Sequence, residues 1–372
     1  MPRKTTPPFR ADHVGSLLRP PELIAAREAR KQNRISAAEL RAAEDRAIGD
    51  AVRMQEELGF QAVTDGEFRR TWWHLDFLEQ FQNATVVPPS VKAKFHRAEG
   101  DIEVMPPGIR VTGKLARPKP IMRDDFNFLK SVAKAMPKLT IPSPSTMHFR
   151  GGRGAIDERA YPDLAGFYAD LGRIYAEEIA DLGAAGCTYL QIDEVNLAYL
   201  CDPKLRDQVR TIGENPDTLP ATYARLINSA IAGRPSGMTI CMHLCRGNFQ
   251  SAWVAEGGYE PVAEILFNQI KVDGYFLEYD DPRSGDFSPL RFVPRGKTIV
   301  LGLVSSKRPA LESIDELRRR IDEAARFVPL DQLALSPQCG FSSTVEGNLI
   351  TPQDQIAKLR LVVETARRVW ND

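Results

Sequence analysis

Short apolar runs alternate with longer amphipathic stretches along most of the chain. Apolar positions at helical spacing predict helices over residues 36–58, 163–182, 217–232, 259–270, 313–327 and 353–369. The apolar runs between them predict buried strands over residues 60–64, 138–141, 188–192, 238–242, 275–278, 297–302 and 333–339. A first short strand and its loop are expected from residue 11.

Repeated strand and helix pairs favour a parallel sheet, because each helix returns the chain to the same edge. Counted from Val14 there are about eight strand candidates, and that number suggests closure of the sheet into a barrel. The predicted fold is α/β, a (β/α)₈ TIM barrel. We expect one barrel domain over residues 1–372.

Two stretches interrupt the alternation. Residues 1–10 are proline-rich and basic, which predicts a flexible arm. Residues 81–125 carry many prolines and valine-rich segments, with a hairpin expected around Ile109–Leu115. We interpret this second stretch as an insertion between early strands of the barrel.

Composition narrows the functional classes. Of the 372 residues, 43% are hydrophobic and 26% charged, as in a globular protein with a large core. Lys+Arg and Asp+Glu both number 49, so neither a nucleic acid nor a membrane partner is indicated. No apolar run has the length of a membrane span, and no signal peptide is recognised, so we expect a cytoplasmic protein. A homo-oligomer is left open.

Cysteine usage and strand ends point to a metal. The five cysteines are an odd number, which argues against a disulfide framework. His243 and Cys245 are two residues apart at the end of a strand, so both side chains lie on one face. Glu278 and Cys339 end two later strands, at the edge where barrels assemble their sites. One imidazole, one carboxylate and two thiols suit Zn²⁺; the alternative is a core histidine with buried cysteines.

These motifs resemble a known family. His243-Leu244-Cys245, Glu278 and Ser336–Gly340 resemble the zinc-ligand motifs of the cobalamin-independent methionine synthases, and Thr64–Arg70, Gln191–Glu194 and His13–Ser16 are also similar. The resemblance begins near residue 10 and covers that family's C-terminal catalytic barrel. It implies transfer of a methyl group to the thiol of L-homocysteine, with zinc as cofactor and methyltetrahydrofolate or another small methyl donor.

The resemblance also implies a place for the amino-acid part of the substrate. It assigns this role to Ser16, Glu67, Asp193 and, less directly, Glu194. An alternative is that Glu67 belongs to a local ion-pair network with neighbouring arginines and that Asp193 caps a helix.

The chemistry agrees with a thiol substrate. Zinc lowers the pKa of a bound thiol, and Glu278 would be the displaceable ligand, whereas a hydrolytic zinc site has more histidines. Trp72, Trp73 and Trp253 are candidates for stacking on a flat donor, against simple packing. Arg246 is expected either to attract an anionic substrate group or to pair with a carboxylate.

The sequence departs from the family around the donor. The long enzymes have an additional N-terminal barrel, and a histidine thought to protonate the donor, where this chain has Val304 and Ser305. Residues 140–148 lack the tryptophan associated with the pterin ring, and His148 is the candidate for proton transfer instead. Two other hypotheses remain: a related thiol alkyltransferase, for example one joining an epoxide to coenzyme M, and a zinc-stabilised scaffold without activity.

Overall fold

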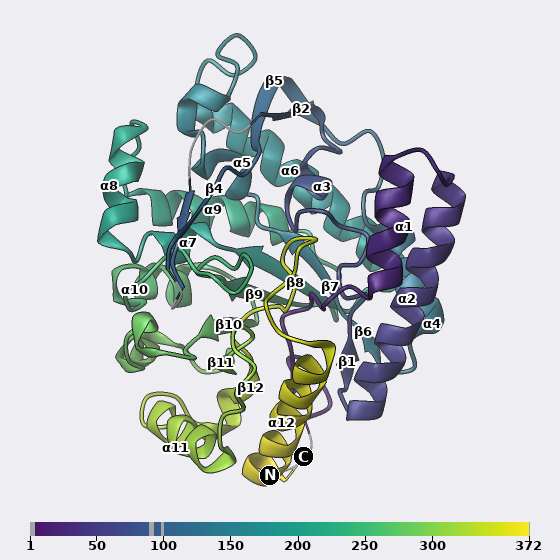
Figure 1. Ribbon diagram of the computed structural model, residues 1–372. Coiled ribbons are helices and arrows are strands. Elements are labelled where there is room, and N and C mark those ends of the chain that lie inside the picture. The colour runs from purple at the N-terminus through teal and green to yellow at the C-terminus, as the bar shows by residue number, and fades with distance from the viewer. Residues whose placement is uncertain (1–3, 89–92, 98–99, 372) are drawn as a thin grey trace.

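A computed structural model describes residues 4–88, 93–97 and 100–371. At its centre, six parallel strands form one sheet in the order β12-β11-β10-β9-β8-β7 (Figure 1). These strands are β7 (Leu139–Pro142), β8 (Tyr189–Glu194), β9 (Thr239–Leu244), β10 (Gly274–Glu278), β11 (Thr298–Val304) and β12 (Leu333–Pro337).

Short pairings near the N-terminus complete the ring. β1 (Ala62–Val63) pairs in parallel with β6 (Met136–Pro137), which precedes β7 by one residue. At the other edge, Ala11 forms a parallel bridge with Leu335 of β12. The backbone N–H of Leu17 donates to the carbonyl of Gly66 at 3.1 Å, which joins the first segment to the loop after β1. The sheet therefore closes, and the predicted TIM barrel is confirmed.

Helices surround the strands on the outside of the barrel (Figure 1). The predicted helices are present with ends shifted by up to three residues: α2 (Ala37–Leu58), α6 (Leu164–Ala184), α9 (Leu219–Ile231), α10 (Glu260–Gln269), α11 (Ile314–Ala324) and α12 (Pro352–Trp370). The capping box expected at α2 is formed by Ser36 and Glu39, each side chain accepting from the other's backbone N–H. Gly59, at φ 96°, ends that helix in the left-handed conformation.

Several helices were not predicted. They are α1 (Pro21–Lys31), α3 (Leu75–Leu78), α4 (Arg123–Val132), α5 (Thr146–Phe149), α7 (Asn196–Tyr199) and α8 (Pro203–Thr211), with the 3₁₀ turns η1 (Gly152–Ala155), η2 (Pro282–Ser284), η3 (Ser288–Phe292) and η4 (Leu330–Gln332). Both α1 and α8 begin with a proline at the first helical position, where no N–H is needed. The short helices α3, α5 and α7 follow strands of the barrel, in the loops that carry the site.

The expected insertion is present, but its hairpin was misplaced. It contains β2 (Gln82–Val87), β3 (Ala93–Phe95), β4 (Ile102–Val104) and β5 (Gly108–Ala116). Residues 109–115 form one continuous strand that pairs antiparallel with β2, so the hairpin expected there is wrong. The chain stays extended through Gly113 because Val111 and Leu115, on either side of this glycine, are both buried in the core. A bridge between His96 and Trp253 connects the insertion to the loop after β9.

The segment before the first barrel strand is packed, not free. Phe9 is 3% exposed and belongs to a cluster inside the barrel with Val14, Ala62, Tyr189, Cys241, Phe276, Val300 and Ala334. The Arg10 guanidinium donates to the carbonyls of Asp331 and Leu333. The expectation of a flexible arm is therefore wrong for Phe9 and Arg10, because burial of Phe9 outweighs the freedom of the chain. Residues 1–3 lie outside the described residues.

A buried ion pair crosses the same barrel interior. Lys138 Nζ donates to Asp12 Oδ1 at 3.0 Å and lies 4.0 Å from the centre of the Phe276 ring. Around the barrel, a second and much larger apolar cluster joins the strands to the helices. Within the described ranges, no helix combines the length and apolar character needed to cross a membrane.

Candidate metal centre and substrate cavity

Four side chains meet at the C-terminal edge of the barrel. His243 lies near the end of β9 and Cys245 follows that strand, Glu278 is the last residue of β10, and Cys339 lies two residues beyond β12. One ligand atom of each residue lies within 4.8 Å of those of the other three, and all four residues are buried. The two sulfur atoms are 3.5 Å apart. Three strand ends thus place one nitrogen, one carboxylate and two sulfurs around one point.

The electrostatics of this group favour a cation. Neither ring nitrogen of His243 makes a hydrogen bond within the described residues. The hydrogen bond from Cys245 lowers the pKa of Cys339 well below its usual range, and the same contact raises that of Cys245, so the pair readily holds one negative charge. Burial, and then the charge of Cys339, raise the pKa of Glu278. A zinc ion would offset this repulsion, and the donor set fits it.

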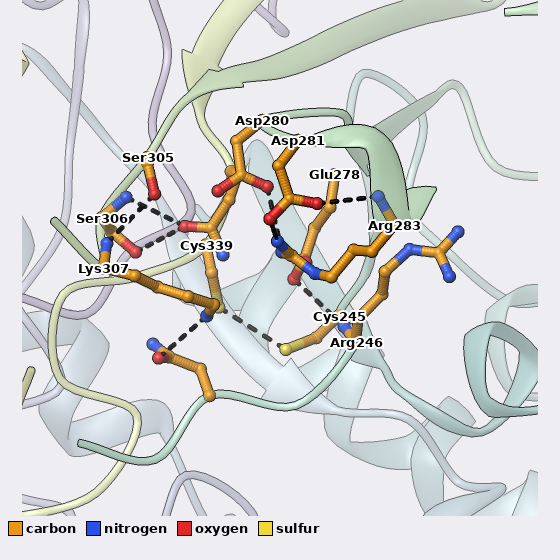
Figure 2. A network of polar contacts seen from close by, with 12 residues as sticks. Cys245, Arg246, Glu278, Asp280, Asp281, Arg283, Ser305, Ser306, Lys307 and Cys339 are labelled. Carbon is orange, nitrogen blue, oxygen red and sulfur yellow. Dashed lines mark hydrogen bonds and ion pairs between the residues drawn. The ribbon is translucent and has the colours of Figure 1, made fainter. Parts of the chain in front are cut away.

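Glu278 is held by a network of polar contacts (Figure 2). Its Oε1 accepts from the backbone N–H of Arg246 at 3.0 Å, and its Oε2 lies 3.2 Å from the Arg283 guanidinium. Arg283 also pairs with Asp280 at 2.9 Å. Glu278 therefore keeps hydrogen-bond partners whether or not it contacts a metal, as a displaceable ligand requires.

A second group of contacts surrounds Cys339. Lys307 Nζ donates to Asn248 Oδ1 at 3.1 Å, and in Figure 2 its side chain extends toward Cys339 and Cys245. The charge of Lys307 lowers the pKa of both Cys339 and Glu278, although other groups act on each more strongly. The backbone N–H of Ser306 donates to the Gln338 side-chain oxygen at 3.0 Å. This contact fixes the loop that carries Cys339 against the loop after β11.

A cavity of about 960 Å³ opens beside the four candidate ligands. His243, Cys245 and Cys339 line it, together with Ser16, Glu67 and Asp193. The structure thus brings three of the four expected substrate-binding residues to the metal group. Ser16 lies so close to the loop after β12 that a Cβ at Gly340 would be 1.9 Å from its hydroxyl oxygen.

Glu67 and Asp193 form a pair of buried carboxylates. Burial, and then the charge of Glu67, raise the pKa of Asp193 to about 7; burial also raises that of Glu67. The hydroxyl of Thr140 donates to Glu67 at 2.8 Å, and Arg70 lies 3.5 Å from the same oxygen. Burial and mutual repulsion disfavour negative charge on both carboxylates, so a substrate ammonium would offset the repulsion.

The alternative of a local ion-pair network holds for part of this region. Arg69 does not line the cavity and pairs with Glu44 at 3.2 Å, Asp45 at 2.7 Å and Asp125 at 3.0 Å. Arg69 therefore links α2 to α4, while Glu67 is directed into the cavity.

Glu194 has a different position from the one expected. Its carboxylate accepts from the backbone N–H groups of Asn196 and Leu197 and from the Ser145 hydroxyl. It does not line the cavity. Glu194 therefore caps the short helix α7, because unpaired N–H groups at a helix start need an acceptor, and the substrate role expected for it is not supported.

His148 is also away from the cavity. Its ring is fully buried and surrounded by Phe167, Tyr168 and Tyr223, with Nδ1 2.9 Å from the Tyr223 hydroxyl. Its Nε2 lies 3.2 Å from Glu214. A proton donor must reach the reacting group, and His148 does not line the cavity, so the structure gives no support to the proton-transfer role predicted for it.

The expected aromatic residues have separate roles. Trp72 and Trp73 line the cavity, and Trp72 is stacked on Phe249 with ring centres 6.4 Å apart. Trp253 is not a lining residue; it packs against His96 of the insertion at 4.9 Å. Arg246 is buried over the Tyr259 ring at 4.3 Å. Among the described residues its side chain pairs with no carboxylate, and it does not line the cavity.

Comparison with known proteins agrees with the geometry. The family model for the catalytic domain of cobalamin-independent synthases matches residues 9–368. This chain belongs to that family. It is 48% identical to YxjH of Bacillus subtilis, an uncharacterized protein, over 98% of this chain and 95% of that one.

Two solved structures of cobalamin-independent synthases are similar. One, from Listeria monocytogenes, is a candidate vitamin-B12-independent methionine synthase with 36% identity and a TM-score of 0.77, covering 99% of this chain and 100% of that one. The other is a B12-independent methionine synthase from Shewanella in complex with selenomethionine. It has 20% identity and a TM-score of 0.71, and the match covers 97% of this chain and 98% of that one. The second likeness shows a shared fold.

Proposed function

We propose that this protein is a zinc-dependent S-methyltransferase that converts L-homocysteine to methionine. The observation that carries the proposal is the meeting of His243, Cys245, Glu278 and Cys339 within 4.8 Å, beside a cavity that holds Glu67 and Asp193. The first group would hold zinc and the second the substrate ammonium. Membership of the synthase family and the selenomethionine found in the Shewanella protein support this assignment.

Each part of the site has a defined task in this reaction. Bound zinc lowers the pKa of a substrate thiol, so that a thiolate is available at neutral pH. Glu67 and Asp193 orient the amino acid by accepting hydrogen bonds from its ammonium. Arg283 and the backbone N–H of Arg246 hold Glu278 in place as the thiol approaches. The methyl group moves from the donor to sulfur, and the donor's leaving atom takes up a proton.

The two carboxylates separate this function from its closest alternative. A thiol that carries a sulfonate, such as coenzyme M, would bring the negative charge of the sulfonate toward Glu67 and Asp193. Like charges at this range repel, and burial strengthens the repulsion. The amino-thiol is therefore the better substrate for this cavity.

Zinc-edge X-ray absorption on the purified protein tests the proposal. We expect zinc with two sulfur and two nitrogen or oxygen neighbours, and a third sulfur after addition of L-homocysteine. The variant Cys339→Ser should lose zinc and retain its circular dichroism spectrum, whereas Cys187→Ser, at a buried cysteine away from the site, should keep the metal. Zinc without any change on adding the thiol would contradict the proposed substrate, and wild-type zinc in Cys339→Ser would contradict the ligand set.

A further inference from the structure

One wall of the cavity carries polar groups that the proposed reaction does not yet use. His74 precedes α3, Thr146 begins α5, Arg150 follows α5, and Tyr199 ends α7. All four line the cavity, and all four come from short loop helices that the sequence pattern did not reveal. The wall faces the same space as the candidate metal ligands.

Two of these four residues have a buried polar atom without a hydrogen-bond partner within the described residues. His74 is 2% exposed and Thr146 4%, yet neither His74 Nδ1 nor the Thr146 hydroxyl oxygen makes a hydrogen bond within the described residues. Buried polar atoms are nearly always paired, so two unpaired ones on one cavity wall indicate a missing ligand. Each such atom costs about 1–3 kcal/mol when left unsatisfied.

Arg150 supplies a positive charge to the same wall. Arg150 keeps an exposed surface, but the surrounding protein desolvates its guanidinium enough to lower its pKa, and the Tyr199 phenol opposes that shift. Burial first, and then the charge of Arg150, lower the pKa of His74 well below its usual value, so its ring is neutral at pH 7. Arg150 makes no ion pair within the described residues, so the cavity places a guanidinium beside hydroxyl and imidazole groups, which together favour an anion.

The wall also lies near the reacting end of the cavity. Trp73 packs against Cys245 and Cys339, and its ring centre is 4.6 Å from that of His74. One aromatic ring therefore separates His74 from the thiols. A molecule that contacts this wall can extend over Trp73 toward the metal group, as a methyl donor must.

We propose that His74, Thr146, Arg150 and Tyr199 form a subsite for an oxyanion of the methyl donor, either a carboxylate or a phosphate. The donor is therefore anionic, while the acceptor is held by its ammonium at Glu67 and Asp193. Charges of opposite sign at the two ends of the cavity keep the two substrates in separate places. The anion site itself is inferred from the geometry alone. That its ligand is the methyl donor rests on the proposed function.

Isothermal titration calorimetry with 5-methyltetrahydrofolate and its uncharged dimethyl ester tests the subsite. We expect the acid to bind wild-type protein at least about tenfold more tightly than the ester, since a charge-assisted hydrogen bond is worth that much. In Arg150→Gln the acid should bind no better than the ester. Arg150→Lys keeps the charge and should retain part of the preference for the acid over the ester. Arg225→Gln, at an exposed arginine on α9, should retain all of that preference.

Inorganic phosphate, titrated in the same way, distinguishes a phosphate donor from a carboxylate donor. Binding of phosphate alone, lost in Arg150→Gln, supports the subsite with a phosphate-bearing donor. The proposal is overturned if wild-type and Arg150→Gln protein bind both probes equally, or if neither probe binds wild-type protein. Failure of the proposed function is seen separately, as zinc absorption spectra that do not respond to homocysteine, because the calorimetry requires no turnover.

Discussion

Glu67 combines an unusual backbone with a buried charge. Its φ of 59° is in the left-handed region, which a residue with a Cβ adopts at a cost, and the side chain is 3% exposed. The carbonyl of Glu67 accepts from the Arg19 guanidinium at 2.8 Å, and this contact holds the turn. Such strain persists where the surrounding structure fixes it, which agrees with a substrate-binding role.

Replacement of Glu67 by Gln tests that role. We expect the affinity for L-homocysteine to fall by about tenfold or more, because a hydrogen bond between two charged groups is lost, while zinc content stays unchanged. Calorimetric titration of the zinc-loaded protein measures the affinity. Glu44→Gln is the matched control, because Glu44 contacts the neighbouring Arg69 and does not line the cavity. Unchanged affinity in Glu67→Gln would remove this residue from the site.

His13 gives the protein a defined dependence on pH. Burial, and then the charge of Lys138, lower the pKa of His13 to about 4, against 6.5 in the unfolded chain. Between these values the unfolded state binds more protons, so stability falls as the pH decreases from about 6.5 to 4. The loss from this residue is at most about 3 kcal/mol.

The variant His13→Gln should lack this part of the acid dependence. Urea unfolding at a series of pH values measures it, as the slope of the unfolding free energy against pH. An equal slope in wild-type and His13→Gln protein would show that other groups cause the acid sensitivity.

At the scale of elements, the loops after the strands build the site and the strands position the loops. β11 ends with a register shift between Gly302 and Val304, and the backbone N–H of Gln338 donates to the Val304 carbonyl at 2.8 Å. This contact sets the direction of the chain just before Cys339. The irregularity at β11 thus helps to bring the last ligand toward the others.

Gly302 is required for that close approach. A Cβ at Gly302 would lie 2.7 Å from the Cα of Gln338 and 2.8 Å from the carbonyl oxygen of Leu277, both backbone atoms that cannot rotate away. Gly302→Ala should destabilise the protein by about 1–3 kcal/mol through overpacking and reduce zinc content. Gly233→Ala, where nothing lies within 4 Å of the new Cβ, should change stability little. Equal urea midpoints for the two variants would contradict this account.

At the scale of the molecule, the barrel does not depend on the candidate metal ligands for its core. Residues of every barrel strand contribute to the apolar clusters, including Leu190, Ile240, Leu277, Leu301 and Leu335. The candidate ligands lie at strand ends, on the edge of this core. A metal bound there would therefore add stability by binding to the folded state and would not be needed to create the fold.

Removal of zinc by a chelator should accordingly leave the fold intact. We expect an unchanged far-ultraviolet circular dichroism spectrum and a melting temperature lowered by a few degrees, with recovery when zinc is added back. A cooperative loss of helical signal on chelation would instead favour a zinc-stabilised scaffold without activity, since such domains unfold without their metal.

How much of this could be predicted from the sequence depends on the range of the interactions. Periodicity located the strands and the long helices, because burial of one face acts locally and repeats along the chain. Because parallel barrel strands all end at one edge, the strand ends alone predict the four candidate ligands. Zinc, the substrate and the roles of these residues stay predictions until they are measured.

The tertiary structure decided what depends on distant packing. The hairpin expected at residues 109–115 is wrong because β2, distant in sequence, pairs with that segment. A free arm is likewise wrong for Phe9 and Arg10, because they are buried by distant parts of the barrel. Glu194 and His148 could not be told from site residues by position, since only the direction of a side chain separates a helix cap from a ligand.

The barrel and the kinds of side chain at the C-terminal ends of its strands follow from the sequence alone, because both depend on the local hydrophobic period and on the direction of the strands. Which of those residues face the cavity, and the wall of His74, Thr146, Arg150 and Tyr199, were decided only by the tertiary structure. Thr146 and Arg150 lie at the two ends of α5, whereas His74 and Tyr199 come from the loops around α3 and α7, so the four residues lie at three short helices that no common sequence period connects. Their common surroundings arise from the closure of the barrel, which brings together loops that are far apart along the chain.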